Sequence, residues 1–110
     1  MSANVTIAYL RPSTDSAKKW AVTLVTPDGT RKTVHFGAKG YEDFTMHHDL
    51  HRKALYLKRH AKNHENWKKA GIATAGFWSR WLLWGEPSIS ASIRMIQNKF
   101  NIQIKRASPP

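Results

Sequence analysis

A tryptophan-rich stretch constrains the fold of this chain more than any other feature. Three of the five tryptophans fall within residues 78–84. On an α-helix, Phe77, Trp81 and Trp84 would share one face. Rings of this size dominate any core or interface that they enter. We therefore expect a short helix over about residues 75–84 that supplies the centre of the hydrophobic core. The alternative is an exposed aromatic platform that binds a partner.

The end of this helix and its one charged residue can also be predicted. Gly85 followed by Pro87 is typical of a helix C-terminus, with glycine at the cap and proline shortly beyond it. Arg80 lies one helical turn before Trp84. Its guanidinium is therefore expected to reach that indole face.

The composition indicates a basic, folded domain. A chain of 110 residues is long enough for one domain with its own core, and 41% of its residues are hydrophobic. Lysine and arginine number 18 against 7 acidic residues, which gives a formal net charge of +11. This excess favours polyanionic partners. The absence of cysteine excludes disulfides and thiolate metal sites.

No segment has the character of a membrane anchor or a secretory signal. The apolar runs are far shorter than the ~20 residues that span a bilayer. Residues 1–5 lack a basic region followed by an apolar one. We therefore expect a protein that acts inside a cell or enclosed in a particle, with no membrane partner.

Alternating residues predict a β-hairpin. Apolar residues alternate along residues 20–26 and again along residues 30–37. Between them, Pro27-Asp28-Gly29 is typical of a turn. Residues 101–105, which contain Ile102 and Ile104, are expected to return as a strand against the hairpin.

These elements predict an α+β fold, in which an N-terminal β-hairpin packs with three to four short helices. Short apolar runs at both ends of the chain allow additional edge strands. The expected organisation is an N-terminal lead or edge strand over residues 1–17, a single basic domain over residues 18–106, and a disordered tail over residues 107–110.

A helix is predicted over residues 49–62, with Asp49 as its cap and Tyr56 to one side. Its apolar residues recur at helical spacing and form one stripe for packing, too narrow for a full core helix, so we expect much of its circumference to face water or a ligand: Leu50, Ala54, Leu57 and Ala61. A short second helix is expected over residues 64–70. A last helix is expected to start near Ser88, with a stripe of Ile89, Ile93, Ile96 and Phe100.

Basic residues interleaved with aromatic ones are the strongest functional signal. Seven lysines and arginines lie in residues 52–69 against one acid, Glu65. Cations on a helix face neutralise phosphates and anchor a protein on nucleic acid without reading its bases. We therefore predict binding to double-stranded DNA without sequence preference; the alternative is a solvated basic face with no ligand. The predicted contacts are Arg52, Lys53, Lys58, Arg59, Lys62, Lys68, Lys69 and Arg80.

Six histidines raise the question of a metal site or of catalysis. His60 and His64 would share one face if the helix continued between them. Neighbouring lysines and arginines oppose a bound cation, so we predict no metal and no cofactor. The enzyme alternative is a nuclease, with these candidates for base and metal ligand: His47, His48, Asp49 and Glu65. The absence of clustered carboxylates and of a phosphate-binding loop favours a non-enzymatic protein.

Three segments are distinctive enough to compare with known families: VHFGAKGYEDFT (residues 34–45), HDLHRKALYLKRH (residues 48–60) and TAGFWSRWLLW (residues 74–84). Together they resemble the dinoflagellate/viral nucleoprotein family, small basic proteins of large DNA viruses and of dinoflagellate nuclei. The resemblance covers about residues 20–100. The tryptophan motif is its most specific part.

The resemblance implies sequence-independent DNA binding and compaction, in place of histones or beside them, in a virion and/or a nucleus. Carried over by motif, the phosphate contacts would be Arg52, Lys53, Lys58, Arg59 and Lys62, above a tryptophan core. Such nucleoproteins often begin with a long lysine-rich tail, whereas residues 1–17 here carry only one cation, Arg11. An alternative is therefore a structural virion protein, a minor capsid or inner-shell component that acts through protein–protein contacts.

Overall fold

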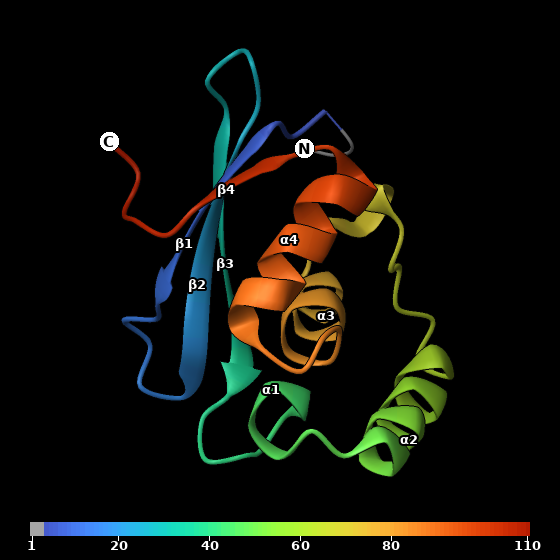
Figure 1. Cartoon of the computed structure of the whole chain (residues 1–110). Helices are drawn as coiled ribbons and strands as arrows, with labels where there is room; N and C mark the ends of the chain where they lie inside the picture. Colours follow the sequence, from blue (N-terminus) through green and yellow to red (C-terminus); the bar gives the residue numbers. More distant parts are fainter. Residues whose placement is uncertain (1–3) are drawn as a thin grey trace.

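The computed structural model describes residues 4–110 and has the predicted α+β fold (Figure 1). Within these residues one sheet lies on one side and the helices gather on the other. The strands are β1 (Ile7–Pro12), β2 (Lys18–Val25), β3 (Arg31–Ala38) and β4 (Gln103–Lys105). The helices are α1 (Phe44–His47), α2 (Leu50–Ala61), α3 (Ala75–Trp78) and α4 (Ile89–Phe100), with a 3-10 turn over Lys69–Gly71 and a π-helical turn over Ser79–Leu83.

The strand order in the sheet is β3-β2-β1-β4. β2 pairs antiparallel with β3, which confirms the hairpin, and also with β1. β4 pairs parallel with β1, with Ile104 opposite Ala8. The prediction of a lead or an edge strand over residues 1–17 is therefore wrong for residues 7–9 of β1, because β4 pairs with their second edge. Residues 1–3 of that predicted lead lie outside the described residues.

Asp28 fixes the predicted hairpin turn. Its carboxylate accepts hydrogen bonds from the Thr26 hydroxyl and from the Thr30 amide (3.1 Å). These bonds, the one from Thr26 first, lower the pKa of Asp28 to about 2. Gly29 follows with φ 87°, in the left-handed region that glycine adopts without strain. The turn residues thus form the structure that their chemistry predicts.

The tryptophan-rich helix lies at the centre of the core, as the sequence predicts. Trp78 is fully buried, and its indole N–H donates a hydrogen bond to the Ile72 carbonyl (2.7 Å). Its ring centre lies 6.1 Å from that of Phe36 on the sheet. Phe77 and Leu82 are also fully buried. Burial of each such side chain stabilises the fold by about 2 kcal/mol.

The π-helical turn over Ser79–Leu83 separates the three tryptophans. Across this turn the Trp84 amide donates to the carbonyl five residues before it (3.1 Å), and the wider turn redirects the side chains that follow. Phe77 and Trp81 both pack edge-on against Phe100, at 5.0 and 5.4 Å. Trp84 instead faces α2. The prediction of one shared face therefore holds for Phe77 and Trp81 and is wrong for Trp84.

Gly85 follows the end of this segment, at a position where no larger residue fits. A Cβ at this position would lie 2.2 Å from the Trp81 carbonyl oxygen and 2.8 Å from the Met95 methyl. Ser88 then caps α4 by accepting a hydrogen bond from the Ala91 amide (3.1 Å). Both the stop at this glycine and the last helix are confirmed.

Residues 62–68 connect α2 to the core without a regular helix. The sequence predicts a helix over residues 64–70, but only Lys69–Gly71 forms a 3-10 turn. His64 has φ 57°, a left-handed conformation that interrupts a right-handed helix. That part of the prediction is therefore wrong.

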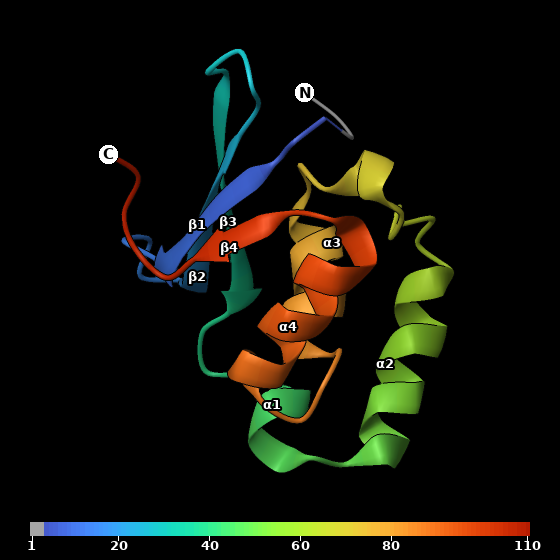
Figure 2. The same cartoon turned by 45° about the horizontal axis from the view of Figure 1, so that its top comes forward.

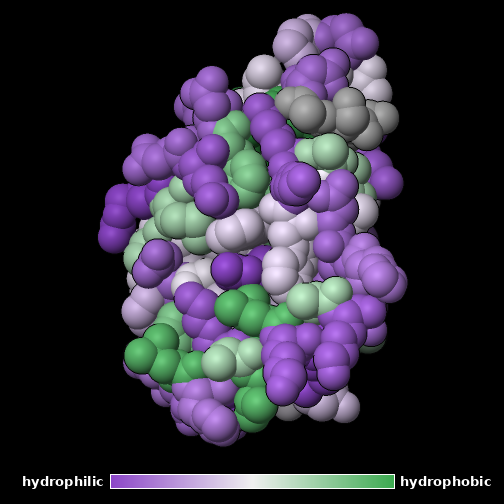
Figure 3. Space-filling view, turned by 90° about the vertical axis from the view of Figure 1, so that its right-hand side faces the viewer, coloured by the Kyte–Doolittle hydropathy of each residue, from purple (hydrophilic) through white to green (hydrophobic). Residues whose placement is uncertain are grey.

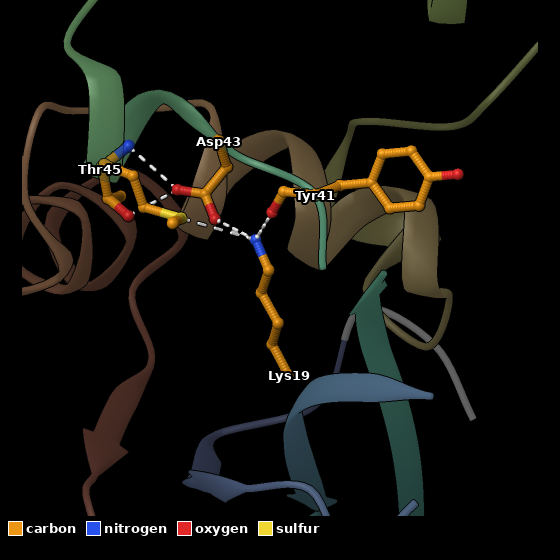
Figure 4. A network of polar contacts seen from close by, with 5 residues as sticks. Lys19, Tyr41, Asp43 and Thr45 are labelled. Atoms are coloured by element: carbon orange, nitrogen blue, oxygen red, sulfur yellow. Dashed lines mark hydrogen bonds and ion pairs between the residues drawn. The ribbon is translucent and has the colours of Figure 1, made fainter. Parts of the chain in front are cut away.

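A buried ion pair connects β2 to the loop before α1. Lys19 Nζ lies 2.8 Å from Asp43 Oδ2 and also donates to the Tyr41 carbonyl (Figure 4). The same carboxylate caps α1 by accepting from the Thr45 amide (3.0 Å). The side chains are only 17% and 4% exposed for the lysine and the aspartate. The pair therefore fixes α1 against the sheet in a region with little access to water.

Two further predictions concern the C-terminus and membranes. In the predicted disordered tail, the Pro110 carbonyl accepts a hydrogen bond from Arg31 at the start of β3 (2.9 Å). None of the helices formed by residues 4–110 is both long enough and apolar enough to cross a bilayer.

Candidate nucleic-acid interface

Helix α2 stands apart from the sheet and joins the rest of the protein along one side (Figures 1 and 2). Tyr56 makes the main contact, because its buried ring stacks on Trp84 with centroids 4.3 Å apart and planes 6° apart. His60, one turn later, stacks on Tyr56 at 4.1 Å. An aromatic pair of this kind adds about 1 kcal/mol beyond the area that it buries. This stack sets the orientation of α2.

Lys53 also faces the protein interior. Its Nζ donates to the Gly85 carbonyl (2.7 Å) and lies 4.9 Å from the centre of the Phe44 ring. Burial lowers the pKa of Lys53, and the positive charge of Arg80 lowers it further. Because its ammonium group is engaged in these internal contacts, we remove Lys53 from the predicted phosphate contacts.

The predicted apolar stripe is not the buried side of α2. Leu50 is 73% exposed, Ala54 and Ala61 are exposed, and only Leu57 is half-buried. Tyr56, which was predicted to stand to one side, takes the buried position. The reason is that an indole ring offers this large flat side chain a partner of matching shape.

Four of the predicted contacts are exposed side chains, three on α2 and one on the residue that caps its C-terminal end, and we call them the α2 basic face: Arg52, Lys58, Arg59 and Lys62. Arg52 lies 3.7 Å from Glu42 in an exposed pair, and such pairs are weak. Among residues 4–110 the other three cations form no ion pair. Figure 3 looks onto the side of the molecule where α2 lies, and hydrophilic groups there surround smaller apolar areas. The face is therefore free to attract a polyanion.

Arg80 is enclosed by the tryptophans. Its guanidinium carbon lies 4.1 Å from the centre of the Trp81 ring and 5.5 Å from that of Trp67. Nη1 donates to the Trp84 carbonyl (3.1 Å), and burial lowers the pKa of Arg80. The predicted contact with the Trp84 indole face is wrong, because the π-helical turn directs that ring toward α2. We therefore also remove Arg80 from the phosphate contacts.

Lys68 and Lys69 lie beside the C-terminal end of α4, apart from the α2 basic face (Figure 2). With Lys99 they line an open groove of about 650 Å³. Lys99 is not among the predicted contacts, because it is an isolated cation on an otherwise ordinary helix. Only the tertiary structure brings it to the other two.

Two of the histidines near α2, His47 and His60, make hydrogen bonds within the protein. His60 Nδ1 lies 2.6 Å from Glu65 Oε2, and His47 Nδ1 accepts from the Asp49 amide (2.9 Å). His64 lies beyond the end of α2, so it does not share a helix face with His60 as its spacing had suggested. Over residues 4–110, no group of three or more histidines and carboxylates is arranged to hold a metal ion.

Asp49 makes the helicity of α2 sensitive to acid. Its carboxylate accepts from the Arg52 amide (3.2 Å) and the His51 amide (2.9 Å), and these bonds lower the pKa of Asp49. Because the pKa is lower in the folded state, the cap stabilises α2 above the ordinary aspartate pKa and is lost as pH falls through the lowered value. In an NMR titration, both amide resonances should shift together at that lowered pKa.

Asp49→Asn is the matched control, since asparagine also caps helices but does not titrate. It should leave α2 helical at neutral pH and abolish the coupled shift. If the two amides titrate unchanged in Asp49→Asn, the carboxylate is not the group responsible.

The chain is similar to a family of unknown function (DUF5754) over residues 8–60. The matched part runs from β1 to the last turn of α2, so it contains the hairpin and every residue of the α2 basic face except Lys62, but not the tryptophan-rich helix. None of the curated proteins or solved structures gives a significant match. The similarity therefore assigns no activity.

Proposed function

We propose that this protein binds double-stranded DNA through the phosphate backbone, using the α2 basic face. The observation that carries the proposal is that its four exposed cations lie on one helix and its C-terminal cap, and that the stack of Tyr56 on Trp84 holds this helix in place. The charges are thus presented in a fixed arrangement. The formal net charge of +11 adds long-range attraction to any polyanion.

We infer that binding has little sequence preference. Phosphate contacts position a protein on DNA but carry no sequence information. DNA of any sequence should therefore bind with similar affinity, which is what a packaging protein requires.

Packaging or compaction of DNA in a virion and/or a nucleus is the role that we propose. The resemblance of residues 34–45, 48–60 and 74–84 to nucleoproteins supports it. We do not propose an enzyme, because the carboxylates near α2 are engaged in other contacts. Asp43 pairs with Lys19, Glu65 pairs with His60, and Asp49 caps α2.

A second candidate function is a structural component of a virus particle that acts through protein–protein contacts. One observation favours it: the large exposed hydrophobic residues of the described chain fall within residues 41–55. They are Tyr41, Met46, Leu50 and Leu55, which are 73%, 56%, 73% and 49% exposed. Apolar side chains of this kind, when they cluster, mark interfaces between proteins.

The test of the proposed function is an equilibrium titration with two duplexes of equal length and unrelated sequence. We expect equal affinities for the two duplexes and binding that weakens steeply as salt is raised, because bound phosphates release their counterions. Absence of binding at low salt would overturn the proposal and favour the particle component, whose apolar contacts should persist in salt.

A further inference from the structure

The open groove beside α4 combines aromatic walls with a cationic rim. Trp67 and Trp81 are half-buried there, and Phe100, the last residue of α4, lines the groove with them. Lys69 begins the 3-10 turn and Lys68 is the residue before it. Lys99 lies in the last turn of α4. Figure 2 shows these two segments side by side. The volume of about 650 Å³ lies within the range of roughly 300–1,000 Å³ that is usual for ligand sites.

Hydrogen bonds hold both indole rings in place. The Trp67 indole N–H donates to Glu65 Oε1 (3.1 Å), and the Trp81 indole N–H donates to the Trp67 carbonyl (2.8 Å). Trp81 also packs edge-on against Phe100 at 5.4 Å. These contacts occupy the polar edges of the rings, and the Arg80 guanidinium lies over a face of each ring, 4.1 Å from the centre of Trp81 and 5.5 Å from that of Trp67. The ring surface left to the groove is apolar carbon. Rings fixed in this way lose little entropy when a flat partner stacks on them.

The charge around these rings is positive. Lys99 Nζ lies 5.1 Å from the centre of the Trp81 ring, and within residues 4–110 none of Lys68, Lys69 and Lys99 forms an ion pair. The one acid of the groove, Glu65, is already engaged by His60 and Trp67. A ligand that fits must therefore offer both flat apolar faces and negative charge.

We propose that this groove binds unpaired bases of a single nucleic-acid strand, with Trp67 and Trp81 as the stacking surface and the three lysines on the adjoining phosphates. Bases alternate with phosphates along a strand, which matches aromatic walls beside a cationic rim. An acidic peptide would complement the positive charge of the lysines but offers no regular row of flat rings. The inference rests on the proposed function in that both require a nucleic-acid partner, but it uses different residues.

The test measures the anisotropy of a labelled oligothymidylate and of a labelled duplex with the same set of variants. Trp67→Ala should weaken binding of the oligothymidylate roughly tenfold, the loss expected for one stacked base. Lys68→Ala/Lys99→Ala, which removes two exposed cations, should flatten the slope of log K against log salt by about 1.4. Neither variant should lose affinity for the duplex to the extent that it loses affinity for the oligothymidylate. Tyr41→Ala, which removes an exposed aromatic ring elsewhere, is the control and should change nothing.

The inference is overturned if the wild-type protein does not bind the oligothymidylate, or if both groove variants bind it as the wild type does. It is also overturned if a peptide of alternating glutamate and phenylalanine displaces the oligothymidylate at a lower concentration than an unlabelled strand does. The duplex, tested with Arg52→Ala/Arg59→Ala/Lys62→Ala, reports on the proposed function separately. Loss of duplex binding in that variant with no effect of the groove variants leaves the proposed function standing and removes this inference.

Discussion

Replacing Trp84 with alanine should release α2 from the body of the protein and lower the free energy of unfolding by about 3 kcal/mol. The ring of Trp84 is the surface on which Tyr56 stacks, and His47 packs against it at 5.3 Å. α2 has only 12 residues, and a helix of this length is marginal without tertiary contacts. Since α2 carries the proposed contacts, duplex affinity should fall as well.

Amide hydrogen exchange measures this effect directly, because the α2 amides of Trp84→Ala should lose protection while those of the sheet keep theirs. Tyr56→Phe is the matched control. The Tyr56 hydroxyl is buried and has no hydrogen-bond partner among residues 4–110, so its removal should cost little and keep the stack. If α2 stays protected in Trp84→Ala, the helix is held by contacts other than this stack.

Asp43→Ala should lower the free energy of unfolding by a similar amount, about 3 kcal/mol. The substitution leaves the largely buried Lys19 ammonium without its carboxylate, and it removes the cap of α1. Breaking one partner of a buried pair is costly because the remaining charge has lost both water and its counter-charge. Urea denaturation monitored by tryptophan fluorescence measures the change.

The double substitution Asp43→Asn/Lys19→Met separates the two contributions. It removes both charges and keeps a side chain that can cap α1, so it should be less destabilising than Asp43→Ala. If Asp43→Ala unfolds at the wild-type urea concentration, the pair contributes little and α1 is positioned by its apolar contacts.

The parts of the fold that the sequence predicts correctly depend on residues close together in the chain. The hairpin follows from alternation on both sides of Pro27-Asp28-Gly29, and the bonds of Asp28 are local to that turn. The core position of the tryptophan-rich helix follows from its size and apolar character alone. The stop at Gly85 follows from local sequence too, although the physical reason is a close approach to Trp81.

The parts that the sequence does not predict depend on distant residues. The apolar residues of α2 do lie at helical spacing, but Tyr56 is the buried residue of this helix. It is buried because its ring stacks on Trp84, which is distant in the sequence. β1 becomes an inner strand because Gln103–Lys105 arrives from the other end of the chain. The spacing of apolar residues and the composition contain no information on such distant partners. The predicted packing side of α2 is therefore its apolar stripe and not the side of Tyr56.

The residues of the candidate site also divide into those that the local sequence reveals and those that depend on distant parts of the chain. Sequence reasoning finds the cations of α2, because they are dense and share one helix. It also includes Lys53 and Arg80, which have the right charge but are engaged by Gly85 and by the tryptophans. Lys99 joins the groove only through folding, so no local signal could have identified it.

Our central claim is that the α2 basic face contacts the phosphates of duplex DNA. The most direct measurement is the slope of log K against log salt for the wild type and for Arg52→Ala/Arg59→Ala/Lys62→Ala. A control with the same loss of charge removes three exposed lysines outside α2: Lys32→Ala/Lys39→Ala/Lys105→Ala.

If the claim is correct, the α2 variant flattens the slope by about 2.7, the value for three released phosphate contacts. The lysine control should lower affinity only through the weaker overall charge and should change the slope far less. Equal slopes for the wild type and the α2 variant, or equal losses in the two variants, would contradict the claim.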